Sequence, residues 1–331
     1  MLVKQNSIGK ANKKAQLSKK QKYFRYLKFY LIPGWRDPEF SAQEYKIEKV
    51  KSKRRLFRHL VKPLTIIGLI MVLFISVLAI FAPVLTIYPL QDLVVPHVPP
   101  IPEVFAPPSA EHPLGTTYNG YDVLARIIWG ARTTILSSLI PVTISIGGGL
   151  IIGIISAYFG GAIDYIIMRF VDLFYAFPTL ILIIIVTPMV SSDLLTTLII
   201  YGILFIPYNI RFMRSLVFQV KQLEYVQAAK VGGASRFIVM FKHILPNALS
   251  PMLVSFFGGA AIAIIGLAGL AFIGFSDNTV ASWGIDILWA RGKYTNISAA
   301  VWPGLFIGIA AIGYILVGDG FRDALDPRLK L

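Results

Sequence analysis

The sequence contains no cysteine and only four histidines, which lie far apart along the chain. Without cysteine there is no disulfide framework, no thiol nucleophile and no thiolate ligand for a metal. The phosphate-binding pattern GxxxxGK[ST] is also absent, as are HExxH and GxSxG. We therefore predict no catalytic residue, no metal site and no cofactor held by this chain.

Charged residues are scarce as well. They make up 15% of the 331 residues, whereas 56% are hydrophobic and the mean hydropathy is +0.68. Soluble domains are typically about a quarter charged. This composition excludes disordered, fibrous and disulfide-stapled proteins and indicates a membrane protein.

The hydrophobic residues gather in long runs without Asp, Glu, Lys or Arg. A helix needs about 20 such residues to cross a bilayer. Six runs reach that length: 63–91, 133–163, 173–192, 194–210, 243–276 and 294–318. We expect an all-α integral membrane protein with six transmembrane helices. The first run starts too far from the N-terminus for a cleaved signal peptide, so residues 1–62 are expected to remain as a cytoplasmic tail.

The positive charge is concentrated in that tail. Residues 1–62 hold 18 Lys and Arg against 4 Asp and Glu, which accounts for nearly all of the net charge of +15. Basic residues beside a membrane span indicate the cytoplasmic side and a contact with anionic lipid. With six spans, 28 Lys and Arg fall on the N-terminal side of the membrane and four on the other. We predict that both termini are cytoplasmic and that the tail binds lipid rather than nucleic acid.

The chain divides into four expected segments. They are the basic tail (1–62), the first span with a proline-rich external loop and a short helix (63–132), a five-helix core (133–318) and a cytoplasmic C-terminal tail (319–331). Residues 122–132 place Asp122 and Arg126 as an i,i+4 pair on one helical face and hydrophobic residues on the other. This short helix is expected to lie on the outer membrane surface; the alternative is that it simply begins the second span.

Few charges lie within the expected spans. Arg169 and Asp172 are three residues apart near one end of the third span, which favours a structural ion pair over a proton relay. A stand-alone channel or a secondary transporter would need more buried charge or a filter sequence. Small residues four positions apart, Gly149, Gly153 and Ala157 with Gly304 and Gly308, predict close helix crossings.

The loop 211–246 between the fourth and fifth spans is long enough to be functional. It predicts a short helix, a break at Gly232-Gly233 and a second helix that enters the membrane. The first helix is short, rich in small residues and suited to a groove on a partner protein. A helix lying on lipid would be expected to have a larger apolar face.

This loop resembles the signature of permease subunits of binding-protein-dependent ABC importers, which reads EAA, three residues, Gly, nine residues and Ile-x-Leu-Pro. Here Gln227-Ala228-Ala229 precedes Gly233, and His243-Ile244-Leu245-Pro246 follows nine residues later. The sequence is most similar to the "C-type" permeases of the dipeptide, oligopeptide and nickel importers. Supporting stretches are 112–116 with 120–133, 167–178 and 318–328; departures from the pattern are Thr117, Tyr121 and Gln227.

The resemblance implies a type I ABC importer permease fold and covers about residues 60–331. It implies a heterodimer with a second permease subunit, two cytoplasmic ATPases that bind ATP and Mg²⁺, and an external solute-binding protein. The residues implied to couple to the ATPases are Glu224, Tyr225, Gln227, Ala228, Ala229, Gly233, Ala234, Ser235 and Arg236. The implied cargo is a di- or oligopeptide; an oligosaccharide or a nickel chelate is the alternative. The residues that bind the cargo are unknown.

Overall fold

The computed structural model describes residues 62–94, 104–291 and 297–325. The chain divides into two compact units, residues 63–322 and residues 1–62 with 323–331. The predicted lipid contact of the basic tail therefore lies outside the described residues. Only the first unit is described below, and the described part of it contains helices but no β-strand.

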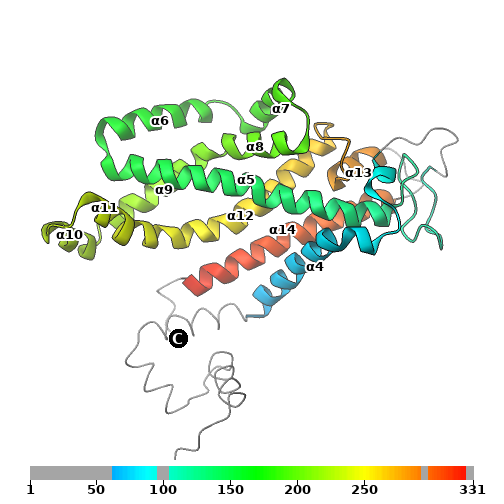
Figure 1. Ribbon diagram of the computed structural model, residues 1–331, viewed down its shortest axis with the longest axis horizontal. Coiled ribbons are helices and arrows are strands. Elements are labelled where there is room, and N and C mark those ends of the chain that lie inside the picture. Colours follow the sequence, from blue (N-terminus) through cyan, green and yellow to red (C-terminus); the bar gives the residue numbers. More distant parts are fainter. Residues whose placement is uncertain (1–61, 95–103, 292–296, 326–331) are drawn as a thin grey trace, which may run out of the picture. The chain divides into compact units, whose positions relative to one another are not determined.

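Five long segments of the first unit are apolar enough to cross a membrane (Figure 1). They are α4 (Pro63–Leu85), α5 (Val123–Phe159), α8 with α9 (Leu194–Leu204 and Ile206–Lys221), the segment Arg236–Phe272, and α14 (Ser298–Leu325). The segment Arg236–Phe272 consists of α11 (Arg236–Ile238), the π-helical turn η2 (Val239–Ile244) and α12 (Leu245–Phe272). Many large hydrophobic side chains on these helices are exposed, as expected of a surface that faces lipid.

The predicted third span is broken. α6 (Gly161–Tyr175) and α7 (Thr179–Val190) meet at an angle of 86°, and Pro178 directly precedes α7. The twelve residues of α7 extend about 18 Å, less than the hydrocarbon thickness of a bilayer. The predicted count of six spans holds if this bent pair is counted as one span, but residues 173–192 do not form one continuous helix.

The expected surface helix 122–132 is instead the beginning of α5. This helix runs through 37 residues without a break, and the Asp122 carboxylate caps it by accepting a hydrogen bond from Ala125 N at 2.7 Å. The expectation of a separate helix is wrong because residue 133 continues the same helical path. Three shorter helices complete the described part of the unit: η1 (Leu90–Leu93), α10 (Glu224–Val231) and α13 (Trp283–Ala290).

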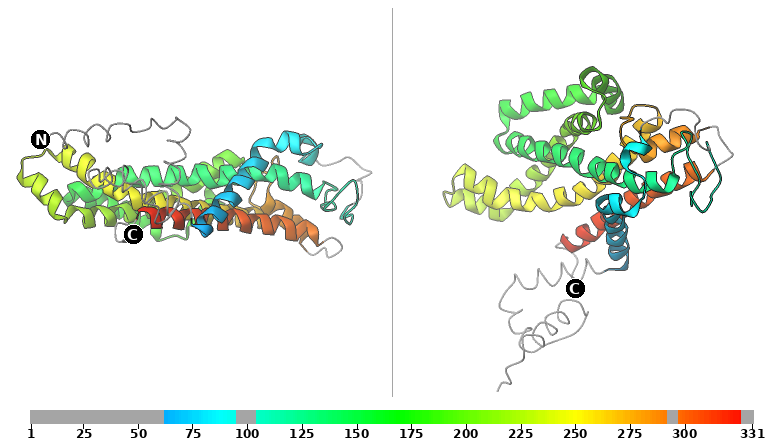
Figure 2. Two further views of the ribbon diagram at one scale, coloured as in Figure 1. Left: turned by 90° about the horizontal axis from the view of Figure 1, so that it is seen from below. Right: turned by 45° about the vertical axis from the view of Figure 1, so that its right-hand side comes forward.

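Helix α5 is the centre of the unit and contacts α4, α8, α9 and α12 (Figures 1 and 2). Glycines bring α5 and α9 close: a Cβ on Gly149 would lie 2.2 Å from Asn209 Cβ, and one on Gly153 would lie 2.8 Å from Met213 Cβ. These two positions confirm the predicted close crossing. The prediction is wrong for Gly308 within the described residues, since nothing lies within 4 Å of that position.

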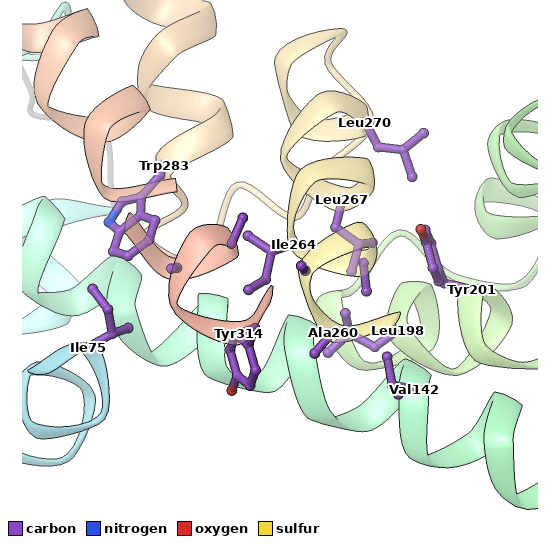
Figure 3. Close-up of a cluster of buried hydrophobic side chains, with 14 of the residues drawn as sticks. Ile75, Val142, Leu198, Tyr201, Ala260, Ile264, Leu267, Leu270, Trp283 and Tyr314 are labelled. Carbon is purple, nitrogen blue, oxygen red and sulfur yellow. The ribbon is translucent and has the colours of Figure 1, made fainter. Parts of the chain in front are cut away.

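The main hydrophobic core joins helices from the whole unit (Figure 3). Ile75 comes from α4, Val142 from α5, Tyr201 from α8, Ile264 from α12 and Tyr314 from α14. A second core, which we call the loop core, lies where α5, α9 and α12 approach the predicted docking loop. Its buried members are Ile154, Ala157, Met213, Val217, Val226, Val239, Met240, Ile244, Ala248 and Met252.

Candidate functional site: the loop between α9 and α12

The loop 211–246 folds as a short helix between two long ones. Helix α9 continues to Lys221, α10 (Glu224–Val231) follows after two residues, and the chain re-enters helix at Arg236. Gly233 separates α10 from α11 with a φ of +80°, a conformation that glycine adopts without strain. Ser235 then caps α11, as its hydroxyl accepts a hydrogen bond from Ile238 N at 3.4 Å. The predicted order of helix, glycine break and helix is confirmed.

One buried residue fixes α10 to the rest of the unit. Val226 has no exposed surface and belongs to the loop core, which α5, α9, η2 and α12 also supply. Gln227 adds a hydrogen bond from Nε2 to Lys221 O at 2.8 Å, and the ring of Tyr225 lies 6.4 Å from that of His243. Helix α10 is therefore held against α9 and η2, the turn that leads into α12, and through the loop core it is linked to α5.

The remaining candidate residues lie at the surface. Tyr225 is 43% exposed, and burial of the rest of its side chain raises the pKa of its hydroxyl. The exposed candidates are Glu224, Tyr225, Gln227, Ala228, Gly233, Ser235 and Arg236, while Ala229 and Ala234 are half-buried. The predicted coupling residues are thus exposed or half-buried along α10 and the start of α11, and their coupling role stays a prediction.

Two further exposed residues of this loop are hydrophobic and were not among the predicted coupling residues. Val231, which ends α10, is 91% exposed, and Phe237 in α11 is 66% exposed. Their positions on either side of the glycine break are the only sequence signal that could have identified them. Val226 was missed as well, because its burial depends on helices that are distant in sequence.

The predicted ion pair of Arg169 and Asp172 is not found among the described residues. Asp172 instead accepts a hydrogen bond from Arg211 Nη2 at 2.6 Å, and Arg169 lies over the ring of Tyr165 at 4.9 Å. A second pair, which the sequence reading did not predict, joins Asp164 of α6 to Arg214 of α9 through two hydrogen bonds of 2.7 Å. These pairs attach α6 to α9, since α6 buries only Val171.

The stretch 112–133, which resembles the family's external motif, has a structural explanation. His112 Nδ1 lies 3.1 Å from Asp122 Oδ1, so the residue that caps α5 also holds the preceding loop. Gly130 lies directly beneath Trp283, where a Cβ would come within 2.5 Å of the indole nitrogen. The predicted surface pair of Asp122 and Arg126 is wrong: both are buried, and Arg126 pairs with Asp286 of α13.

Known proteins that are similar to this chain are membrane components of transport systems. Residues 149–331 match the family described as the inner membrane component of binding-protein-dependent transport systems. The chain is 34% identical to the dipeptide transport system permease protein DppC of Alkalihalophilus pseudofirmus, over 89% of this chain and 96% of that one. It is 35% identical to the protein of the same name from Haemophilus influenzae, over 80% of this chain and 90% of that one. It is 33% identical to the glutathione transport system permease protein GsiD of Pectobacterium atrosepticum, over 67% of this chain and 75% of that one.

The match covers more than half of the chain, includes α10 and the helices that hold it, and extends to the last residue. The relatives are membrane permeases of peptide transport systems and are similar over nearly their whole length. The chain belongs to the family of inner membrane components of binding-protein-dependent transport systems, and is a multi-pass membrane permease.

Proposed function

We propose that this chain is one of two permease subunits of an importer that carries di- and oligopeptides across the cell membrane. A second permease subunit completes the pathway, two cytoplasmic ATPases bind ATP and Mg²⁺, and an external solute-binding protein delivers the cargo. Peptide cargo is supported by the relatives named for dipeptide and glutathione transport. Both termini and α10 lie on the cytoplasmic side, which the basic N-terminal tail supports.

The observation that carries the coupling role is the two-sided environment of α10. Val226 is buried in the loop core, whereas Tyr225 and Val231 are exposed on the same short helix. A partner that binds the exposed side and moves would displace α10 together with the ends of α5, α9 and α12. Hydrolysis by the partners could then shift the permease between two packings, so this subunit transmits work without binding ATP.

Cysteine labelling tests the placement of α10, because the chain has no cysteine of its own. Val231→Cys should crosslink to an ATPase subunit of the assembled importer and resist an impermeant thiol reagent applied to intact cells. Ala110→Cys is the matched control: it is exposed in the loop before α5 and should react from outside without crosslinking to the ATPase. Reaction of Val231→Cys from outside, or crosslinks only to phospholipid, would contradict the proposal.

Uptake tests the activity itself. The importer in proteoliposomes should take up a labelled dipeptide when ATP and the binding protein are present. Deletion of Glu224–Gly233 should abolish this uptake and leave membrane insertion intact, because the helices of the core remain. Normal uptake by the deletion variant would refute the coupling role, and uptake of an oligosaccharide or a nickel chelate in place of peptides would refute the cargo.

A further inference from the structure

A cavity of about 340 Å³, which we call the bundle cavity, lies between the membrane helices α5, α8, α9 and α12. Its lining contains hydroxyl, amide and aromatic groups among aliphatic ones, and none of the described lining residues is Asp, Glu, Lys, Arg or His. The lining residues that the argument uses are Val142, Ser145, Tyr201, Phe205, Tyr208 and Asn209, with Ser255, Gly258 and Ile262 on α12. Polar side chains inside a membrane bundle are costly and commonly mark a pathway.

Two of these polar groups are not used to join helices. Ser145 Oγ donates a hydrogen bond to Val142 O at 3.2 Å, and Asn209 Nδ2 donates one to Phe205 O at 3.3 Å. Both bonds are local to one helical turn and long for their type. Asn209 packs near Gly149 of α5 through its Cβ, but a polar group that joined two helices would be expected to bond across them. Both side chains can instead exchange a weak local bond for one to a ligand.

Tyr201 places a hydroxyl-bearing ring in the lining of the cavity. The residue is 4% exposed, and no hydrogen bond joins its hydroxyl to a described residue. It rises from α8 beside Leu267 of α12 (Figure 3), and its ring stacks on Phe205 with centroids 4.6 Å apart. A phenol hydroxyl can both donate and accept a hydrogen bond. The Tyr201 hydroxyl is therefore available to a ligand at the edge of the cavity.

The bundle cavity opens onto the surface of α9 and α12. Tyr208 is 57% exposed and Ile262 is 61% exposed at this opening. A Cβ added to Gly258 would meet no atom within 4 Å, so the backbone of α12 is bare there. A ligand can therefore enter without displacement of a packed side chain.

We propose that the bundle cavity binds cargo during transport and takes the uncharged main chain of a short peptide. This inference rests on the proposed function. Peptide amides donate and accept hydrogen bonds, which matches the hydroxyls of Ser145, Ser255 and Tyr201 and the amide of Asn209. The aromatic rings of Phe205 and Tyr208 in the lining offer apolar surface against which a peptide plane packs. A lining without charged residues can hold the main chain, and it does not discriminate between cargo side chains of different charge.

The volume agrees with this occupant, since small-molecule sites span roughly 300–1,000 Å³. A metal chelate would gain no ligand from the described lining, which has no carboxylate, imidazole or thiol. A peptide longer than the cavity would extend through its opening. The site thus binds a short segment of the cargo and sets no limit on total length.

Single cysteines in the assembled importer test this site directly. Gly258→Cys places a thiol in open space within the lining, and Ser145→Cys is nearly isosteric. Gly147→Cys is the matched control: it lies on α5 two residues from Ser145, on a different side of the helix, with nothing within 4 Å. The readout is the rate of modification by a polar thiol reagent in proteoliposomes, with and without a transported dipeptide and the binding protein, followed by mass spectrometry of this chain.

We expect the dipeptide to slow modification of Gly258→Cys and Ser145→Cys about tenfold at a concentration ten times its Kd. Modification of Gly147→Cys should be unaffected. Once modified, the Gly258→Cys importer should lose dipeptide uptake, whereas the modified Gly147→Cys importer should keep it. Because the reagent is added after assembly, a folding defect cannot produce this result.

The outcomes separate the two proposals. If the unmodified importer takes up dipeptide but cargo protects neither cavity cysteine and the modified Gly258→Cys importer still transports, the cavity assignment is overturned and the proposed function stands. If only an oligosaccharide is taken up and it protects both cysteines, the assignment to a peptide main chain is overturned together with the peptide cargo.

Discussion

Arg126 and Asp286, 160 residues apart in sequence, form an ion pair in which each side chain is only 1% exposed. Arg126 also donates a hydrogen bond from Nη1 to Leu93 O and lies over the rings of Trp289 and Tyr121, at 4.7 and 5.4 Å from their centroids. One guanidinium therefore joins η1, α5 and α13. The pair thus holds together η1, which precedes α5, and α13, which follows α12.

The change Arg126→Met should destabilise the protein strongly. It leaves the Asp286 carboxylate buried without its partner, and breaking a buried pair in this way costs about 3–5 kcal/mol. The double variant Arg126→Met/Asp286→Leu should recover most of this loss, because both charges are removed. Chemical denaturation of the purified protein in detergent, followed by its tryptophan fluorescence, measures the difference. Equal destabilisation in the single and double variants would show that the rings and not the charges hold α13.

The close approach of α5 and α9 gives a second prediction. Gly149→Val should destabilise the unit by about 1–3 kcal/mol or prevent folding, since overpacking forces neighbouring atoms to shift. The added Cβ would lie 2.2 Å from Asn209 Cβ and 2.7 Å from the Asn209 backbone carbon. Gly147→Val on the same helix is the control, because its Cβ meets open space. Thermal unfolding of both variants in detergent checks the prediction, and similar midpoints would contradict it.

The continuous membrane helices, and the order of helix, break and helix in the loop 211–246, could be predicted from the sequence because both depend on local features. Long runs without charge define α4, α5, α12 and α14, and Gly233 marks the break after α10. The family resemblance is equally local, since its motif lies within twenty residues. The comparisons bear it out.

Pairing across helices could not be predicted in the same way. Asp122 and Arg126 have the spacing of a surface pair. In the structure, however, the Asp122 carboxylate caps α5, and Arg126 pairs with Asp286, which lies 160 positions further along the chain. The predicted pair of Arg169 and Asp172 is not formed for a similar reason, since Asp172 of α6 pairs with Arg211 of α9. The bundle cavity could not be predicted from the sequence either, because its lining comes from four helices that are separate in sequence. Helical spacing specifies which residues share a face, and only packing decides what that face meets.

The ion pair between Asp164 of α6 and Arg214 of α9 predicts that the two charges can be swapped between the helices without loss of stability. Asp164→Asn should weaken the attachment of α6 by about 1 kcal/mol, since the pair is bidentate but partly solvated, with side chains 16% and 31% exposed. Arg214→Asp alone should be worse, because it places two carboxylates together. The exchange variant Asp164→Arg/Arg214→Asp should restore stability toward the original value. Protease sensitivity of the segment between α5 and α7 in detergent is the measurement, and no recovery in the exchange variant would argue against the ion pair.

Asp193 offers a test by pH. Its carboxylate caps α8 by accepting hydrogen bonds from Thr196 N at 2.9 Å and from Thr196 Oγ1 at 2.7 Å, and bonds from Ser191 and Thr196 lower its pKa from 3.8 to about 2. Because the folded-state pKa lies below the unfolded value, the stabilising effect is present above pH 3.8 and is lost as the pH falls toward 2. Protection of the Thr196 amide from hydrogen exchange, corrected for the intrinsic rate, should therefore stay constant from pH 7 to 5 and decline below pH 4. Asp193→Asn retains a good cap without a titrating group, so its protection should not decline over the same range. A parallel decline in both proteins would assign the acid sensitivity of this helix to another carboxylate.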